Sequence, residues 1–288
     1  MIEKIFSKEE IEQIDAIFSL SLLEDLKGDL EKDITNLAVG LSKTKAQYAF
    51  TARHELIICG LPIIEYFFKT YSPNTEIRFF AKDGERVDNI FAEISGFASE
   101  ILSLERIALN ILQRLSSIAT LTHGYSELIA HTKAKIRDTR KTGIAIRPLD
   151  KYAFRIGGGV NHRMGLFDKI LVKDNHLILQ PLEKVIDNVQ AFVAKNPKFA
   201  QFQIECDDLN QVEVCLEKQV PEILLDNMKI PEVIEAKRMR DDISKHTLLE
   251  ASGGLNERNI LAYAETGIDY LAIGSITHSV RAVDIGLD

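Results

Sequence analysis

Basic side chains gather in one stretch of the chain, between Arg137 and His176. This stretch holds nine lysines and arginines against four aspartates, although the whole chain has a formal net charge of −8. Such a reversal of local sign indicates a focused field for a small anionic ligand, whereas binding of nucleic acid would require a basic face over much of a domain. The alternative interpretation is a set of unrelated lysines and arginines on exposed helix faces.

The residue types within this stretch suit anionic groups. Arg140 and Lys141 follow one apolar run, His162 and Arg163 follow a triple glycine, and Lys173 ends a second apolar run. An arginine holds a carboxylate through two parallel hydrogen bonds, and a lysine supplies a compact charge. Taken alone, His162 could equally be a hydrogen-bonded core histidine.

The elements that must position these residues are short apolar runs that recur after Lys133. Each is followed by polar or glycine residues and then by a helix-like stretch, which is typical of parallel βα units. The sequence therefore predicts an α/β fold with an α/β barrel of about seven strands, and a doubly wound open sheet is the alternative. The predicted strands are 135–139, 154–158, 170–173, 202–205, 223–226, 248–251 and 270–273.

In α/β barrels the active site lies at the carboxyl ends of the strands. Glu205 and Asp226 end two predicted strands and supply oxygen ligands that suit Mg²⁺. The turns Ser252-Gly253-Gly254 and Gly274-Ser275 end the last two strands, where backbone N–H groups often bind phosphate. Glu205 and Asp226 could instead be structural ion-pair partners, and a glycine pair can simply allow close packing.

The first part of the chain shows a different order of predicted strands and helices. A capping box of Ser7 and Glu10 predicts the start of a helix, and hairpin-like strands around few helices predict an N-terminal α+β domain with a mostly antiparallel sheet. Two helices over 99–131 are predicted to follow. We expect this domain to span residues 1–115, with the tail 277–288 able to pack on it, and the barrel domain to span 116–276.

Composition bounds the class of protein. The three cysteines are widely spaced without a CxxC pair, which indicates a reduced protein without a disulfide framework or zinc site. The amino terminus lacks the apolar core of a secretory signal, and no apolar run approaches the length of a membrane span. We expect a cytoplasmic protein that binds neither nucleic acid nor a membrane.

Several motifs together resemble the quinolinate phosphoribosyltransferase family, also called nicotinate-nucleotide pyrophosphorylase (carboxylating). The likeness covers nearly the whole chain. The matching motifs are ERIALNILQRLSSIAT at 105–120, DTRKT at 138–142, LDKYAFRIGGGVNHRMGLFD at 149–168, ILVKDNH at 170–176, LLDN at 224–227, EASGG at 250–254 and TGIDYLAIGSITHS at 266–279.

This resemblance implies an N-terminal α/β sandwich, an incomplete α/β barrel and a pentosyltransferase activity of NAD biosynthesis. Phosphoribose would pass from phosphoribosyl pyrophosphate to the ring nitrogen of quinolinate with Mg²⁺, giving nicotinate mononucleotide, pyrophosphate and CO₂. Family members are homodimers, or hexamers built as trimers of dimers, in which Arg106 reaches the neighbour's site.

The resemblance also implies residue roles. Arg106, Arg140, His162, Arg163 and Lys173 would line the quinolinate site. The remaining substrate contacts would come from Thr139, Lys141, Glu205, Asp226, Ser252, Gly253, Gly254, Gly274 and Ser275. Within this set Lys141, Lys173, Glu205 and Asp226 would be the catalytic residues. Glu205 and Asp226 would serve the metal, directly or through substrate or water.

Two segments depart from the family pattern: Gly143-Ile144-Ala145 after DTRKT, and extra residues around 27–32. Three alternative functions remain open from the sequence. A related transferase could use another acceptor such as nicotinate, a barrel aldolase could use Lys173 as a Schiff-base nucleophile, and a degenerate barrel could bind a ligand without catalysis.

Overall fold

The computed structural model describes residues 2–41 and 43–288. The chain forms two compact units, which are described separately. The first comprises Met1–His123, Thr142–Gly158 and Ser275–Asp288, and the second comprises Gly124–Lys141 and Gly159–Gly274. Among the described residues, no helix combines the length and the apolar character needed to cross a membrane.

The first unit opens with the predicted helix, α1 (Lys8–Leu26). Its capping box is confirmed: the Glu10 N–H donates to Ser7 Oγ at 3.2 Å, and the Ser7 N–H donates to Glu10 Oε2 at 2.8 Å. Two otherwise unpaired donors of the first turn are thereby satisfied. Ile14, Phe18 and Leu22 recur at helical spacing and are buried in the core.

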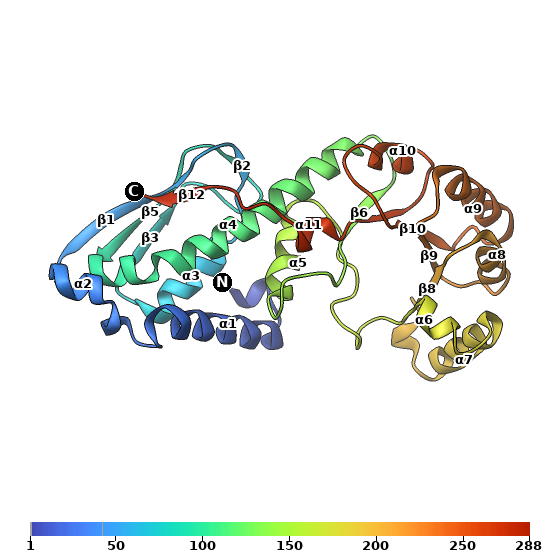
Figure 1. Cartoon of the computed structure of the whole chain (residues 1–288), viewed down its shortest axis with the longest axis horizontal. Helices are drawn as coiled ribbons and strands as arrows, with labels where there is room; N and C mark the ends of the chain where they lie inside the picture. The colour runs from blue at the N-terminus through green and yellow to red at the C-terminus, as the bar shows by residue number, and fades with distance from the viewer. Residues whose placement is uncertain (1, 42) are drawn as a thin grey trace. The chain divides into compact units, whose positions relative to one another are not determined.

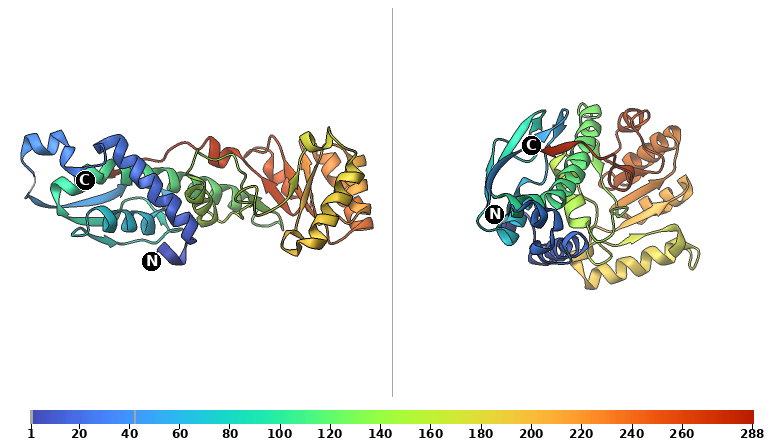
Figure 2. Two further views of the ribbon diagram at one scale, coloured as in Figure 1. Left: turned by 90° about the horizontal axis from the view of Figure 1, so that it is seen from below. Right: turned by 60° about the vertical axis from the view of Figure 1, so that its left-hand side comes forward.

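A four-stranded antiparallel sheet forms the scaffold of the first unit, and α3 (Leu61–Tyr71) and α4 (Ala98–Leu128) lie over one of its faces (Figures 1 and 2). In spatial order its strands are β12 (Ile285–Leu287), β1 (Lys45–Ala52), β5 (Ile90–Phe97) and β3 (Glu76–Phe79). A separate pair consists of β2 (Leu56–Ile57) and β4 (Arg86–Val87). The end of the chain therefore adds an edge strand to a sheet made by its beginning.

The prediction of two helices over 99–131 was wrong, because α4 is a single helix of 31 residues. Residues 98–123 contain neither proline nor glycine, so nothing in the backbone interrupts the helix. The two apolar faces that suggested two helices both belong to α4. Ile101, Leu104, Leu112 and Ile118 are all fully buried along its length.

The second unit is built on a six-stranded, all-parallel sheet, with α7 (Leu182–Lys195), α8 (Leu209–Glu217) and α9 (Ile230–Ile243) along its outer side (Figure 1). This arrangement confirms the predicted α/β class with successive βα units. In spatial order its strands are β6 (Lys135–Arg137), β11 (Tyr270–Ala272), β10 (Leu248–Ser252), β9 (Glu222–Asp226), β8 (Gln203–Cys206) and β7 (Leu171–Val172). The short helices α6 (Asp174–Leu177) and α10 (Ile260–Ala264) follow β7 and β10.

The predicted strand 154–158 was also wrong. Its residues fall at the end of α5 (Arg147–Ile156) and in the turn that follows. Pro148 in the first turn sets a helical φ, and the short apolar run could not by itself distinguish a strand from a buried helix. The extended backbone comes later, as an isolated parallel bridge between Val160 and Arg137. The parallel sheet thus has six strands and one bridge in place of about seven strands.

The two departures from the family pattern have defined backbone conformations. Lys27 and Gly28 both have positive φ at the end of α1, and a short 3₁₀ helix follows at Leu30–Lys32. In the other segment Ala145 has φ 64° and Ile144 is 96% exposed. A Cβ on Gly143 would lie 2.5 Å from Ile146 Cδ1, so any other residue there would require the Ile146 side chain to shift.

Candidate active site

A cavity of about 550 Å³ lies at the carboxyl ends of the parallel strands in the second unit. Strand register brings its walls together: Ser252 at the end of β10 pairs with Asp226 of β9 on one side and with Ala272 of β11 on the other. The lining residues are Asp138, Thr139, Arg140, Lys141, His162, Arg163, Leu171, Lys173, Glu205, Leu224, Asp226, Asn227, Glu250, Ser252, Gly253, Gly254 and Ala272.

One group of lining residues is cationic: Arg140, Lys141, Arg163 and Lys173. Arg163 is only 8% exposed, and its guanidinium donates to the Lys169 carbonyl oxygen at 3.2 Å. Burial and the neighbouring Arg140 both lower the pKa of Arg163. Two arginines in one cavity therefore repel each other until an anion enters, which is the arrangement that a carboxylate-binding site requires.

A second group of residues at the cavity is acidic. Burial, followed by the charges of Glu205 and Asp207, raises the pKa of Asp226. Burial and Glu205 likewise raise the pKa of Asp207. Carboxylates that disfavour one another's charge form a site that gains most from a cation. Lys173 supplies one, since its Nζ lies 2.9 Å from Glu205 Oε2.

A glycine turn, Gly253-Gly254, follows the end of β10 and lines the cavity. Gly253 has φ +96°, and a Cβ there would lie 2.1 Å from Asn227 Oδ1. The Asn227 N–H donates to the Ser252 carbonyl at 2.8 Å, which ties this turn to the end of β9. Only glycine combines this backbone conformation with so close an approach.

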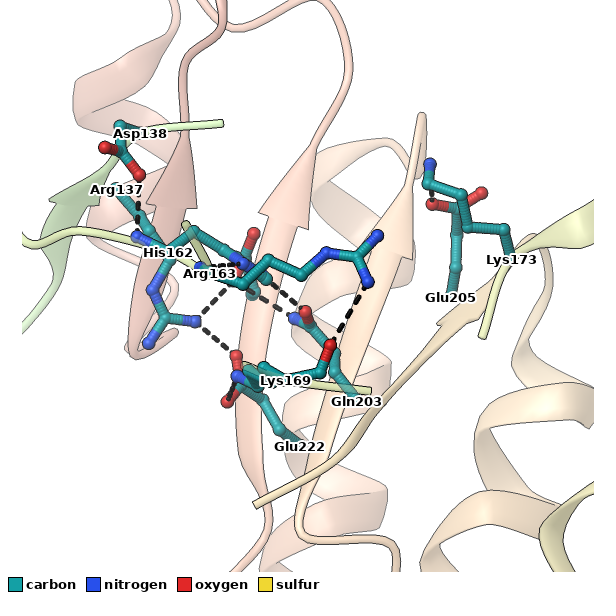
Figure 3. Close-up of polar contacts among 10 residues, drawn as sticks. Arg137, Asp138, His162, Arg163, Lys169, Lys173, Gln203, Glu205 and Glu222 are labelled. Atoms are coloured by element: carbon teal, nitrogen blue, oxygen red, sulfur yellow. Dashed lines mark hydrogen bonds and ion pairs between the residues drawn. The ribbon is translucent and has the colours of Figure 1, made fainter. Parts of the chain in front are cut away.

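A buried polar cluster lies beneath the cationic wall (Figure 3). Arg137 Nη1 bonds carboxylate oxygens of both Glu222 and Glu250, the latter at 2.5 Å. Its guanidinium also stacks on the Tyr270 ring, with 3.4 Å between Cζ and the ring centroid. Burial opposes the charge of Arg137, but Glu250 and Glu222 outweigh it and raise the pKa of Arg137. His162 contacts this cluster through Gln203, at 2.6 Å between Nε2 and Oε1.

The structure brings together all the sequence-predicted site residues except Arg106, Gly274 and Ser275. Arg106 lies on α4 in the first unit, where its side chain is 61% exposed and its Nη2 lies 3.9 Å from Glu105 Oε1. Gly274 is the last residue of the second unit, and Ser275 begins α11 (Ser275–His278) in the first.

Sequence reasoning missed the buried members of the site. Asn227 and Glu250 line the cavity, and Gln203 and Glu222 lie in the cluster beneath it. The available signal was a polar residue two positions before a strand-end residue, as in Gln203 before Glu205 and Glu250 before Ser252. Side chains at such spacing share one face of a strand, so a second polar layer follows about 7 Å below the first.

Comparison with known proteins agrees with this arrangement. Residues 33–116 match the model of the quinolinate phosphoribosyl transferase N-terminal domain, and residues 118–288 match that of the C-terminal domain. A nicotinate-nucleotide pyrophosphorylase [carboxylating] of Mycobacterium leprae is 39% identical over 274 residues, which cover 93% of this chain and 94% of the relative.

Two further proteins are similar to this chain. Quinolinate phosphoribosyltransferase [decarboxylating] 1b of Nicotiana tabacum is 34% identical, over 94% of this chain and 81% of its own length. The crystal structure of nicotinate-nucleotide pyrophosphorylase from Ehrlichia chaffeensis superimposes with a TM-score of 0.86 at 38% identity, covering 95% of this chain and 97% of that one. With both domain models matched in order along its length, this chain belongs to the quinolinate phosphoribosyltransferase family.

Proposed function

We propose that the cavity of the second unit transfers phosphoribose from phosphoribosyl pyrophosphate to quinolinate, with loss of CO₂, to give nicotinate mononucleotide and pyrophosphate. The observation that carries this proposal is the pairing of two kinds of wall in one cavity. Arginines and lysines suit a dicarboxylate, while carboxylates beside a glycine turn suit a phosphorylated sugar with its metal ion.

Quinolinate would bind at the cationic wall. Arg140 and Arg163 would take its two carboxylates, because a guanidinium offers paired donors to a planar acid. Lys173 would stand between this wall and Glu205, with which it already forms an ion pair. His162 and Thr139 would complete the contact surface.

Phosphoribosyl pyrophosphate would bind at the other wall. Lys141 would neutralise the pyrophosphate, and Ser252, Gly253 and Gly254 would offer a turn to the 5′-phosphate. The family resemblance adds Gly274 and Ser275 to this phosphate site. Glu205 and Asp226 would accept hydrogen bonds from the ribose hydroxyls.

Mg²⁺ fits the acidic wall by the chemistry of its donors. Glu205 and Asp226 offer hard oxygen ligands, and the raised pKa of Asp226 indicates that its carboxylate lacks sufficient positive charge nearby. These two residues would hold the ion directly or through substrate or water. When bound with pyrophosphate, Mg²⁺ supplies charge neutralisation of the leaving group.

The chain's own residues then perform two tasks. Arg140 and Arg163 orient the pyridine nitrogen toward the anomeric carbon, whose bond to pyrophosphate breaks as the new C–N bond forms. Glu205 and Asp226 place negative charge near the oxocarbenium-like state. The nitrogen becomes cationic, so the adjacent carboxylate can leave as CO₂ and a proton takes its place on the ring carbon. No covalent nucleophile is required.

Arg106 would complete the site across a homodimer interface, in a dimer or in a hexamer of three dimers. The exposure of its side chain on α4 leaves it accessible to a second subunit. Mixing R106A with K141A tests this arrangement, because each mixed dimer would contain one intact site. We expect about a quarter of the normal activity from the mixture and almost none from either variant alone. An inactive mixture that nevertheless contains mixed dimers would contradict the proposal.

We place the protein in the cytoplasm. Its cysteines are all free and buried, and Cys206 Sγ lies 3.7 Å from Cys215 Sγ without a disulfide bond between them. Such a pair suits a reducing compartment. Fractionation of the native cells would test this localisation, and recovery of the protein outside the cytoplasmic fraction would contradict it.

The direct test of the proposed function is a product assay by mass spectrometry. Purified protein would receive phosphoribosyl pyrophosphate and Mg²⁺ with either quinolinate or nicotinate as acceptor. We expect nicotinate mononucleotide from quinolinate and little from nicotinate, because nicotinate leaves one arginine without a carboxylate partner. A preference for nicotinate would overturn the assignment of the acceptor.

A further inference from the structure

Both ring nitrogens of His162 already have partners inside the protein. The backbone N–H of Arg163 donates to His162 Nδ1 at 2.6 Å, so Nδ1 must be unprotonated. The proton of the neutral ring then lies on Nε2, which donates to Gln203 Oε1 at 2.6 Å. The backbone N–H of His162 itself donates to the buried carboxylate of Asp138, also at 2.6 Å. Backbone and ring are therefore held independently.

Gln203 stands between this imidazole and a carboxylate. It is fully buried, and while its oxygen accepts from His162, its Nε2 donates to Glu250 Oε2 at 3.1 Å. His162 Nε2 lies 3.9 Å from the same Glu250 oxygen, beyond hydrogen-bond distance. The amide thus keeps the imidazole from pairing directly with a carboxylate.

The contacts continue around a closed circuit, part of which is drawn in Figure 3. Glu250 accepts from Arg137, and Arg137 also pairs with Glu222. Glu222 accepts from Lys169 Nζ at 2.5 Å, and the Lys169 carbonyl accepts from Arg163 Nη1 at 3.2 Å. Arg163 then returns to His162 through its backbone N–H. Arg163, a member of this circuit, also lines the cavity.

The four ion-paired side chains of this circuit, two cations and two carboxylates, balance in charge without His162. Beneath the cavity, the positive charges of Arg137 and Lys169 face the negative charges of Glu222 and Glu250. A protonated His162 would add a positive charge without a partner, at a side chain that is only 7% exposed. The same balance argues against a metal ion among His162, Glu222 and Glu250, whose ligand atoms lie within 4.8 Å of one another, because Arg137 and Lys169 together already neutralise both carboxylates.

We propose that Gln203 is a positioning residue: it holds His162 as a neutral imidazole with its proton on Nε2, and His162 thereby orients Arg163 for a substrate carboxylate without donating a ring hydrogen bond to that substrate. This inference rests on the proposed function and refines it. The family resemblance places His162 at the quinolinate site, and the circuit gives it the role of a support for Arg163.

Nuclear magnetic resonance of histidine side chains tests the inference without any variant. In protein labelled with ¹⁵N at histidine, the His162 signal, assigned by its loss in H162N, should show a pyridine-type Nδ1 and a pyrrole-type Nε2 throughout about pH 5 to 8. The burial of the ring, followed by the charge of Lys169, lowers the pKa of His162 to about 4, in agreement with this expectation. A proton on Nδ1, or an imidazolium at neutral pH, would overturn the proposal.

Replacing Gln203 by methionine tests the positioning role. Methionine has similar length but cannot accept from His162 Nε2 or separate it from Glu250. We expect the His162 signals to move and the KM for quinolinate to rise about tenfold, the equivalent of one well-placed hydrogen bond. The KM for phosphoribosyl pyrophosphate should stay nearly unchanged, because its wall contains no member of the circuit.

Q190M is the matched control. Gln190 on α7 makes a single partly buried hydrogen bond, from Nε2 to the Lys218 carbonyl at 2.7 Å, outside the circuit. This variant should lose a similar contact and leave both KM values and the His162 signals unchanged. Unchanged His162 signals and unchanged quinolinate KM in Q203M would overturn the proposal. An inactive unmodified protein would instead contradict the proposed function, and the tautomer would still be readable.

Discussion

Replacing Arg163 by methionine would remove a charge that the folded protein holds at a cost. The side chain is 8% exposed, and burial and Arg140 both act against its guanidinium. Its guanidinium donates to the Lys169 carbonyl, a neutral acceptor. The charge is therefore only weakly compensated until an anion binds, and methionine preserves most of the volume of the stem.

The magnitude follows from this environment. Removing one partner of a desolvated charge pair costs about 2–4 kcal/mol of binding free energy, within the range measured for such truncations. That loss corresponds to quinolinate binding weaker by about thirtyfold to a thousandfold. The free energy of unfolding should fall much less, because the loss of the Lys169 contact is offset by relief of the repulsion from Arg140.

Isothermal titration calorimetry with quinolinate would measure the affinity, and thermal unfolding would measure the stability of the same samples. R238M is the matched control, since Arg238 lies on α9 with its side chain 63% exposed and pairs only with surface carboxylates. Its quinolinate affinity should equal that of the unmodified protein. An unchanged affinity in R163M would refute the reasoning, and so would a loss of affinity that merely follows a loss of folded protein.

Three further predictions concern groups that titrate or react. His162 has a folded-state pKa of about 4 against 6.5, so unfolding takes up a proton between these values. The free energy of unfolding should therefore fall as pH drops through this window, by up to about 1.4 kcal/mol per pH unit, and urea titrations should show a flatter profile in H162N. The pKa of Asp226 is raised, so Mg²⁺ must compete with a proton there. The Mg²⁺ concentration for half-maximal activity should rise as pH falls toward the pKa of Asp226, and a pH-independent value would contradict this. The thiols of Cys59, Cys206 and Cys215 are fully buried, so iodoacetamide should add no mass to the native protein and three adducts after unfolding in urea.

Much of the cavity wall could be predicted from the sequence, for a geometric reason. The carboxyl ends of parallel strands converge, so a charge that ends an apolar run points to the same edge as the next one. Glu205, Asp226 and the turn at Ser252 were found in this way, although they are far apart in the chain. This prediction requires only that the end of each strand be located, and charged or glycine residues after an apolar run mark that end.

The polar residues beneath the cavity could not be predicted in the same way. Gln203, Glu222 and Glu250 lie within strands, and an isolated polar residue in an apolar run does not reveal its partners. Their pairing depends on strand order and register, such as Gln203 beside Glu222 across β8 and β9. These are properties of the folded sheet. They decide that Arg137 and Lys169 together neutralise two carboxylates and that His162 remains neutral.

The local sequence pattern also gave wrong predictions where two kinds of backbone structure produce the same pattern of apolar residues. The run at 154–158 was apolar enough for a strand, yet Pro148 had already started a helix that contains most of it. The long helix α4 has apolar residues on two faces, and only the absence of a helix-breaking residue indicated a single element. In both cases the apolar pattern alone did not determine the backbone conformation.

The most direct test of the central claim uses quinolinate labelled with ¹³C in the carboxylate next to the ring nitrogen. The purified protein would be incubated with this substrate, phosphoribosyl pyrophosphate and Mg²⁺, and both gas and nucleotide would be analysed by mass spectrometry. The account predicts one ¹³CO₂ for each nicotinate mononucleotide formed, with no label in the nucleotide. A nucleotide that retains the label, or the absence of any nucleotide from folded protein that binds quinolinate, would contradict it.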